Sequence, residues 1–250
     1  MSTKFTKPVT VNAPGEDIVF DGIDFTEDAV INVLAAKSLT IKNCRFYNVA
    51  LGDTTTLPLI GDSSTKSGSL VDSEVQLVIE NNYFGKTDTY NMINFYNKLA
   101  AGSRITNNYF VEDCCRDDIA AFFSSADDIE FNITGNEFEM YGNKGMQFSF
   151  INEPKMAINF NDNTIGAADS GMDVAERGMC RFRPFPSKTT SFANITMNAN
   201  GNKFVGENDR IAFCQFKSAN DLVLTEENIP TYYLNGELTP MEILDSRPTT

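Results

Sequence analysis

The sequence predicts an all-β fold, a single-stranded parallel β-helix of about eight coils with a cap at each end. Three observations predict it: one short motif recurs along the chain, each copy alternates apolar with polar residues, and Asn or Gly precedes its last apolar residue. Repetition with a fixed period is typical of solenoids, whose units bury their apolar faces against neighbouring units. Alternation with a period of two indicates strands rather than helices.

The clearest copy of the motif is Ile105–Phe110, with the sequence Ile-Thr-Asn-Asn-Tyr-Phe. The other copies span Leu39–Phe46, Val78–Phe84, Ile133–Phe138, Ile158–Ile165 and Ile195–Phe204, with looser ones at Ile18–Phe25 and Leu222–Ile229. Five of the seven steps between their closing apolar residues span 21 to 28 residues. The two longer steps fit the same unit with a loop inserted.

A second alternating run precedes most copies, so each coil is expected to contain two or three short strands. These runs are Ala29–Leu34, Ser69–Val71, Met92–Tyr96, Ile119–Phe123, Met146–Ile151, Cys180–Phe185 and Ile211–Phe216. Coils wound in one direction pair each strand in parallel with its equivalent, roughly 4.8 Å away. One Asn from each turn should then stack on the next, forming a ladder of bonded amides. The candidates are Asn43, Asn81 or Asn82, Asn107 or Asn108, Asn136, Asn163, Asn202 and Asn228.

The repeat contains no linker, so the chain is expected to form one domain. Residues 1–17 are predicted as an N-terminal cap, 18–229 as the parallel β-helix, and 230–250 as a C-terminal cap or docking tail. Pro240 favours a short helix over Thr239–Leu244, because Pro is well tolerated in a first helical turn. The polar insertions over Gly52–Gly68 and Gly166–Gly178 are expected as surface loops, either binding loops or tolerated excursions.

The composition disfavours several classes of partner. The formal net charge is −14, the pI is about 4.4, and there is no His. The acidic charge predicts no binding to nucleic acid. No apolar run approaches the roughly 20 residues that span a bilayer, and no apolar core follows Met1–Thr10, so we expect no membrane insertion and no signal peptide. No cofactor is expected. The five Cys form no Cys-x-x-Cys pair, which favours buried thiols in a reducing compartment over disulfides or structural zinc.

The Ile-x-Asn-Asn-x-Phe and Gly-Asn-x-Phe copies make residues 18–229 resemble the pectate-lyase-like right-handed parallel β-helix superfamily. Within it, the chain is most similar in character to the virion fibre, tailspike and decoration proteins of bacteriophages. The resemblance implies a right-handed helix and, for the phage rods, a homotrimer. It implies no single activity, because lyases, hydrolases and inert virion parts share this fold.

The first strand of each coil is the face on which enzymes of that superfamily carry their chemistry. Alternation there places Tyr96, Phe122, Arg181 and Arg183 outward, and they are the candidate binding residues. The two aromatic rings could stack on sugars or pack against an identical neighbour, unless a bulge shifts the alternation. The outward positions hold no carboxylate, which leaves that face without a glycosidase pair.

Carboxylates are instead expected at the turn that enters this strand. If the chain is an enzyme, the best catalytic candidates are Asp117 and Asp118, assisted by Arg116. Asp88, Asp118 and Asp173 are weak candidates for calcium ligands, since calcium prefers oxygen donors. A solvated charged edge explains the same pattern without any site.

Two functions follow as hypotheses. The first is a non-enzymatic structural or attachment component of a bacteriophage virion, such as a head fibre, capsid decoration protein or tail appendage. Its expected partners are two further copies in a homotrimer, capsid or tail proteins and, as a further candidate, a glycan. Its expected location is the virion, assembled in the host cytoplasm. The alternative is a carbohydrate-active enzyme, a polysaccharide lyase or glycoside hydrolase.

Overall fold

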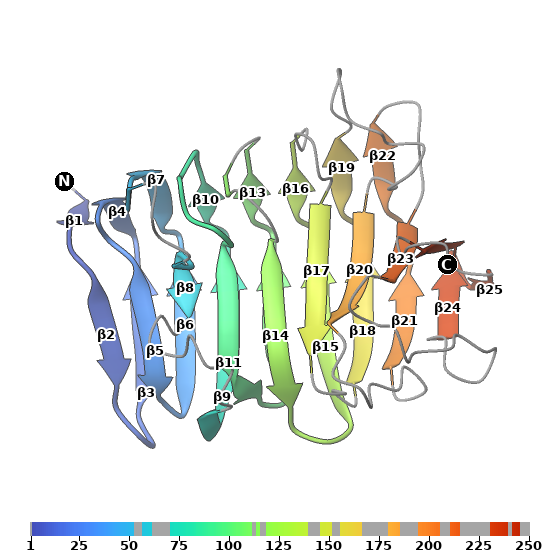
Figure 1. Ribbon diagram of the computed structural model, residues 1–250, viewed down its shortest axis with the longest axis horizontal. Helices are drawn as coiled ribbons and strands as arrows, with labels where there is room; N and C mark the ends of the chain where they lie inside the picture. The colour runs from blue at the N-terminus through green and yellow to red at the C-terminus, as the bar shows by residue number, and fades with distance from the viewer. Residues whose placement is uncertain are drawn as a thin grey trace, which may run out of the picture.

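The computed structural model shows an all-β chain built from three parallel sheets that run side by side along one long axis (Figure 1). It describes residues 2–52, 57–61, 71–111, 114–115, 119–139, 146–151, 156–166, 180–185, 195–205, 211–215, 231–239 and 242–245. Within these ranges no residue is helical, and no helix could therefore cross a membrane. The predicted fold class is confirmed at this level, as a parallel β-solenoid.

Sheet A has eight strands, and each contributes two to five residues. Its strands in order are β1 (Thr3–Phe5), β4 (Ile23–Glu27), β7 (Arg45–Val49), β10 (Tyr83–Phe84), β13 (Tyr109–Phe110), β16 (Glu137–Phe138), β19 (Thr164–Gly166) and β22 (Lys203–Val205). These strands contain the closing residues of the motif, aligned in register from Phe25 to Phe204.

Sheet B contains the runs that precede each motif. Its strands are β2 (Val9–Asn12), β5 (Ile31–Ala35), β8 (Ile60–Gly61), β11 (Ile93–Leu99), β14 (Ala120–Ser125), β17 (Met146–Ile151), β20 (Cys180–Phe185), β23 (Ile211–Gln215) and β26 (Glu242–Asp245). Between β5 and β11 the sheet also contains β8, which is formed by residues expected in the insertion. Of the run expected at Ser69–Val71, Val71 pairs with Asn97 of β11 in this sheet, whereas Ser69 and Leu70 lie outside the described residues.

Sheet C is formed by the first halves of the motif copies. Its strands are β3 (Asp17–Asp21), β6 (Ser38–Lys42), β9 (Val71–Glu80), β12 (Arg104–Thr106), β15 (Ile129–Thr134), β18 (Met156–Asn161), β21 (Ile195–Ala199) and β24 (Thr231–Leu234), followed by the antiparallel β25 (Glu237–Leu238). The start of β9 pairs with β11, so this long strand passes from sheet B into sheet C.

Both ends of the chain contribute strands to the sheets. Residues 1–17, predicted as a cap, supply β1 and β2, which pair in parallel with β4 and β5. At the other end, β24 extends sheet C and β26 extends sheet B. The helix predicted over Thr239–Leu244 is wrong, because Glu242–Asp245 is a strand whose pairing with β23 outweighs the local preference set by Pro240.

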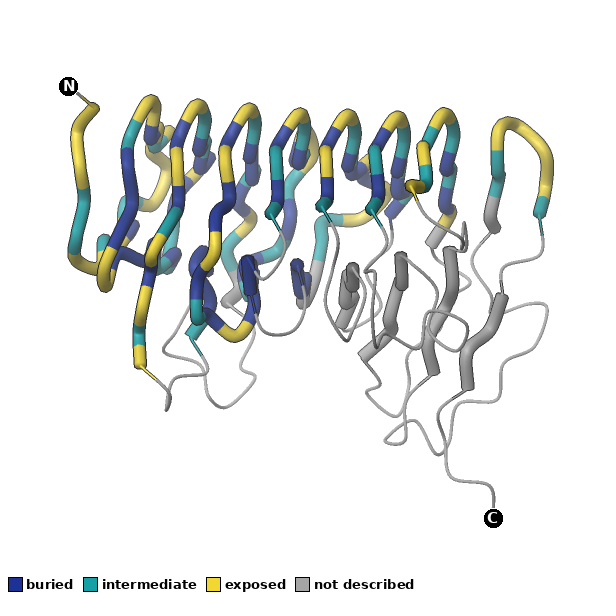
Figure 2. Tube along the Cα trace, turned by 90° about the horizontal axis from the view of Figure 1, so that it is seen from above, coloured by how far each residue is buried: buried dark blue, intermediate teal, exposed yellow. Residues whose placement is uncertain are grey.

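The corner between sheets C and A depends on one left-handed residue per coil. Asn43, Asn81 and Asn107 have φ of 54°, 57° and 55°, and Gly22 and Gly135 have φ of 67° and 66° at the equivalent position. Asn and Gly tolerate this conformation best, so the motif turns sharply there. Figure 2 shows the resulting coils in a row, with exposed residues concentrated at the turns.

The residue after this corner points inward and forms the predicted ladder. Each Nδ2 donates to the Oδ1 of the next Asn, at 3.0 Å from Asn82 to Asn108, from Asn108 to Asn136 and from Asn136 to Asn163. Asn163 continues the series to Asn202 at 3.2 Å. Asn43 lies one position earlier and is not a member, while Asn228 lies outside the described residues. All of Asn82, Asn108, Asn136 and Asn163 are buried, so every amide needs these partners.

The core contains a second ladder, a stack of phenylalanines under sheet A. The rings of Phe25, Phe46, Phe84, Phe110 and Phe138 lie within 11° of parallel, with centroids 4.6–5.0 Å apart. This spacing is that of adjacent strands, roughly 4.8 Å. At the N-terminal end Phe5 and Phe20 meet Phe25 edge to face, which ends the stack.

Candidate functional site

Most of the predicted catalytic and metal residues lie outside the described part of the chain. These are Arg116, Asp117, Asp118 and Asp173. Asp88 is described, and its two carboxylate oxygens accept the backbone amides of Leu51 and Gly52 at 2.7 and 3.2 Å. Asp88 therefore anchors a loop. Among the described residues no three His, Cys, Asp or Glu side chains are grouped closely enough to hold a metal ion.

The predicted aromatic pair on sheet B is not formed. Tyr96 is half-buried on β11 with an outward parity, between the buried Phe95 and Asn97. Phe122 is completely buried, and its ring meets that of Phe131 edge to face at 4.9 Å. The predicted outward orientation of Phe122 is wrong, because β14 aligns Ala120 with Ile93 and hence Phe122 with Phe95.

The candidate arginines can be placed only by their backbone. Arg181 and Arg183 lie on β20, in register with Gln147 and Ser149 of β17. Their role as binding residues stays a prediction.

The described cysteines are buried thiols. Cys44, Cys114 and Cys115 form no disulfide. Burial raises the pKa of the Cys44 thiol, whose sulfur lies 3.2 Å from the Lys42 carbonyl oxygen and 3.6 Å from that of Phe20. A thiol with a raised pKa is a poor nucleophile and a poor metal ligand.

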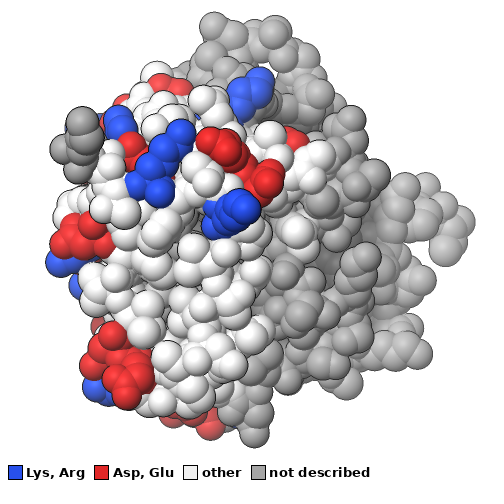
Figure 3. Space-filling view, turned by 90° about the vertical axis from the view of Figure 1, so that its left-hand side faces the viewer, with Lys and Arg blue, Asp and Glu red and all other residues white. Residues whose placement is uncertain are grey.

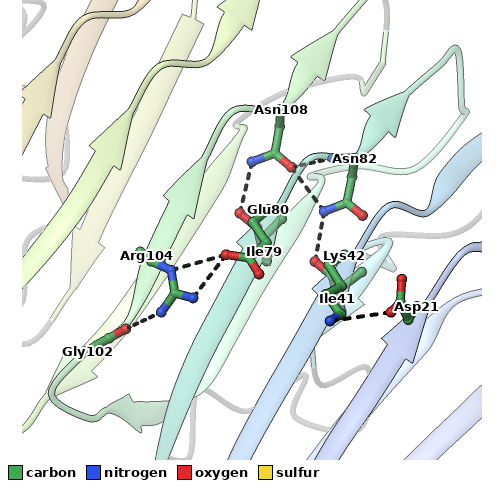
Figure 4. Close-up of polar contacts among 9 residues, drawn as sticks. All are labelled: Asp21, Ile41, Lys42, Ile79, Glu80, Asn82, Gly102, Arg104 and Asn108. Carbon is green, nitrogen blue, oxygen red and sulfur yellow. Dashed lines mark hydrogen bonds and ion pairs between the residues drawn. The ribbon is translucent and has the colours of Figure 1, made fainter.

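Charged side chains on the outside of the solenoid pair from coil to coil. On sheet C, Arg104 donates to Glu80 at 2.9 Å, and Lys42 lies 3.3 Å from Asp21 (Figure 4). Lys37 likewise pairs with Asp17 at 3.0 Å. Seen from the N-terminal end, charged side chains gather along the upper and left-hand parts of the described surface (Figure 3). Exposed ion pairs such as these contribute little to the free energy of folding. Their main effect is therefore on the register between neighbouring strands.

The outer face of sheet A carries a continuous column of side chains, one from each strand. In order they are Lys4, Asp24, Arg45, Tyr83, Tyr109, Glu137, Thr164 and Lys203. Each immediately precedes the inward apolar residue of its strand, so period-two alternation turns it outward. The motif copies contain this signal in the residue before each closing apolar residue, whereas the predicted binding face is on the first strand of each coil and does not include this column.

Two tyrosines occupy the middle of this column. The rings of Tyr83 and Tyr109 are within 9° of parallel, with centroids 5.8 Å apart, and Tyr83 is 40% exposed. Gly85 leaves room for the Tyr83 side chain, because a Cβ at Gly85 would lie 3.0 Å from the Tyr83 ring and 3.1 Å from the Tyr47 Cβ. Tyr109 donates its hydroxyl to Glu139, and this hydrogen bond raises the pKa of Tyr109 to about 12.

A bidentate ion pair lies beside these rings. Arg45 donates to Asp24 through Nε at 2.8 Å and Nη2 at 2.6 Å, and Ser2 donates its hydroxyl to the same carboxylate. The hydrogen bonds from Arg45 are the main reason why the pKa of Asp24 falls to about 2. The Arg45 guanidinium also lies 5.4 Å from the Tyr47 ring centre. We call Tyr47, Tyr83 and Tyr109 with the flanking Arg45 and Glu139 the tyrosine strip.

Comparisons with known proteins add no relative: no family model matches the chain, and no curated protein or solved structure is significantly similar to it.

Proposed function

We propose that this chain is a non-enzymatic structural or attachment component of a bacteriophage virion, such as a head fibre, capsid decoration protein or tail appendage. The observation that carries the proposal is the continuous bonding from coil to coil. The side-chain amides from Asn82 to Asn202 are bonded in series, and the Phe stack runs beside the first of them. A core bonded from coil to coil resists bending and fraying, which suits a rod that bears load or holds a binding surface away from a particle.

In finer detail, we propose a single right-handed β-helix of about eight coils. The eight strands of sheet A support the number of coils. In sheet A, every step from one strand to the next passes through sheets B and C. Connections between parallel strands of one sheet are right-handed in about 98% of cases, which supports the hand. An experimental structure of left-handed winding would contradict this part.

The assembly and location follow from the same role. The proposed partners are two further copies in a homotrimer and the capsid or tail proteins of the particle, and the proposed location is the virion. Mass measurement by light scattering should give about three times the chain mass of 27.7 kDa. Proteomics of purified particles should find the chain at a fixed ratio to the capsid protein. A stable monomer absent from particles would contradict the proposal.

One assay separates this function from the alternative, a polysaccharide lyase or glycoside hydrolase. The purified protein is incubated with host surface polysaccharide, and reducing ends and unsaturated products are measured. A structural component releases neither. Release that is lost in Asp117→Asn or Asp118→Asn would establish the enzyme instead.

A further inference from the structure

We propose that the open edge of β3, at the N-terminal end of the solenoid, binds an extended basic segment of a partner protein, which adds one further parallel strand to sheet C. The inference goes beyond the function proposed above and does not depend on it. Three features of the edge carry it: backbone groups that face away from the sheet, an exposed valine between two carboxylates, and an alternation of charge that stops at β3.

The backbone of β3 is bonded on one side. Among the described strands it pairs with β6 alone, and it lies near the left-hand end of the row of coils in Figure 1. Gly22, just after β3, donates its N–H to the Lys42 carbonyl oxygen at 3.1 Å. Because successive residues of a parallel strand point their N–H and C=O groups to opposite sides, the even-numbered residues face β6. The N–H and C=O groups of Asp17, Val19 and Asp21 therefore face the open edge.

Val19 shows what a second neighbour would cover. Its side chain is 56% exposed, whereas Val78, which occupies the same position of the sheet two coils further on, is 4% exposed. The difference between them is that β9 has a strand on each side, β6 and β12. A sheet edge with free backbone groups is a template for another strand. A strand added beside β3 would bond those groups and bury Val19 as Val78 is buried.

The outward side chains of β3 select a basic segment. Asp17 and Asp21 lie on either side of Val19 on the outer face of sheet C. Lys42 is in register with Asp21 on one side and with Glu80 on the other, so the charge alternates from coil to coil. Opposite charges at opposed positions stabilise a strand pair, and like charges destabilise it. One strand beyond β3, the alternation requires Lys or Arg opposite Asp21.

Both carboxylates can accept a second cation. Hydrogen bonds from Ser38 and Asn43 lower the pKa values of Asp17 and Asp21 respectively, so both groups are ionised at neutral pH. Their existing lysine partners approach from the β6 side, and the side chains of Asp17 and Asp21 remain 55% and 49% exposed. A basic side chain can therefore reach each carboxylate from the open edge.

A second copy of this chain fits the edge poorly. Two β3 strands that met head to head would run antiparallel, and centring the pair on Val19 would place Asp17 opposite Asp21 of the other copy, where like charges repel. Head-to-tail stacking is blocked in sheet C, because the free side of β24 is covered by the antiparallel β25. The occupant is therefore a strand from a different protein.

The strand on the other side of β3 shows which residues the partner segment needs. The sequence from Lys37 to Lys42 has a basic residue at each end, and its apolar Leu39 and Ile41 point into the core. At the open edge the inward Ile18 is only partly buried. We therefore expect an extended partner segment with basic residues at its ends and alternating apolar residues that cover Ile18, a form of strand addition.

The test uses a fluorescent peptide with the sequence of residues 36–43, Ala-Lys-Ser-Leu-Thr-Ile-Lys-Asn, as the added strand. Fluorescence anisotropy measures its binding to the full chain, and hydrogen exchange at the Val19 amide shows where it binds. We expect binding that weakens as salt is added and slower exchange at Val19. A peptide carrying Lys37→Glu and Lys42→Glu should bind about tenfold more weakly or worse.

Val19→Pro removes the N–H that faces the open edge and leaves the bonds to β6 in place, because sheet edges tolerate Pro where the N–H faces solvent. It should weaken peptide binding by about tenfold or more, since that N–H is the donor to the added strand. Val19→Thr keeps the N–H and should bind as the parent does. Thermal unfolding checks that both variants are folded.

The double variant Asp17→Asn with Asp21→Asn tests the charge without changing the backbone, and it should also weaken binding by about tenfold. Its matched control is Glu130→Gln with Glu137→Gln, which removes an equal charge from exposed positions outside the first coil. The control should bind as the parent does, apart from the small effect of net charge.

Failure of the peptide to bind, unchanged exchange at Val19, or an equal loss in the Glu130 and Glu137 control would overturn the inference. A lower mass for Val19→Pro than for the parent in light scattering would also overturn it, because a second copy would then occupy the edge. None of these results depends on whether the parent is a trimer or is present in virions, so this inference and the proposed function fail separately.

Discussion

Asn108 accepts the Asn82 side-chain amide at 3.0 Å and also accepts the Asn82 backbone N–H at 3.0 Å. These residues are 26 positions apart in the chain and adjacent in the solenoid. The same double contact recurs between Asn108 and Asn136 and between Asn136 and Asn163. The ladder therefore bonds each coil to the next through buried groups that have no access to water.

Asn108→Ala should destabilise the fold by about 2 to 4 kcal/mol, because it leaves the buried Asn82 N–H without an acceptor and opens a cavity. Urea unfolding followed by circular dichroism measures the change. The control is Asn159→Ala, in the part-buried series Asn132, Asn159 and Asn198 on the outer face of sheet C. Water can replace those bonds, so we expect a cost below about 1 kcal/mol. Equal losses in the free energy of unfolding for Asn108→Ala and Asn159→Ala would show that the buried ladder contributes no more to stability than the part-buried one.

Cys44→Asn should extend the inner ladder by one member. The Cys44 backbone N–H already donates to Asn82 Oδ1 at 2.9 Å, and its sulfur already lies near the Phe20 carbonyl that an Asn amide would reach. We expect a gain of up to about 1 kcal/mol in the free energy of unfolding, against a loss for Cys44→Ala. If Asn and Ala prove equally harmful, position 44 does not share the ladder geometry.

Gly61→Ala should be far more harmful than Gly22→Ala. Both residues have positive φ, at 138° and 67°, but a Cβ at Gly61 would lie 1.8 Å from the Asn94 backbone oxygen, whereas one at Gly22 meets nothing within 4 Å. Backbone strain alone should cost roughly 1 to 2 kcal/mol at Gly22. At Gly61 the pairing of β8 with β11 must also break, so we expect more than about 3 kcal/mol. Similar midpoints in urea would contradict the close approach of these two strands.

Asp24 should make the protein sensitive to acid. Its pKa is lowered from 3.8 to about 2 in the folded chain, so the unfolded chain binds the proton more readily. The stabilisation from its ionised form is complete above pH 3.8 and is lost as the pH falls toward 2. The difference in melting temperature between the parent and Asp24→Asn should shrink over this range.

Asp28→Asn is the control for Asp24→Asn, since it removes an equal charge from an exposed position. A parent-minus-Asp24→Asn difference that stays constant from pH 5 to pH 2 would contradict the role of the Arg45 pair.

Most of the fold could be predicted from the sequence, because every coil of the solenoid repeats the same local pattern of residues. The copies at Val78–Phe84 and Ile105–Phe110 predicted the strand, the turn with Asn and the ladder of bonded amides, all of which the structure shows. Each rule depends only on neighbours in sequence or on the equivalent residue one coil away. A single well-defined copy is therefore enough to place the others.

The errors arose where alternation fails. Ile119, Ala120, Ala121 and Phe122 are all apolar and all buried, so the alternation of apolar and polar residues cannot show which two belong to the inner face. The pairing of Ala120 with Ile93 decided it, and that register is a tertiary property. The tyrosine strip was visible in the repeat, but recognising it required knowing that the position before each closing Phe faces outward on its own sheet.

The central claim is that asparagines one period apart are in contact within coils stacked in parallel. A crystal structure that resolves side chains tests it most directly, through the separation of Asn82 Nδ2 from Asn108 Oδ1. The account predicts 3.0 Å, with Tyr83 beside Tyr109 in parallel register. Amide groups lying well beyond hydrogen-bonding distance, or strands of these two coils running antiparallel, would contradict it.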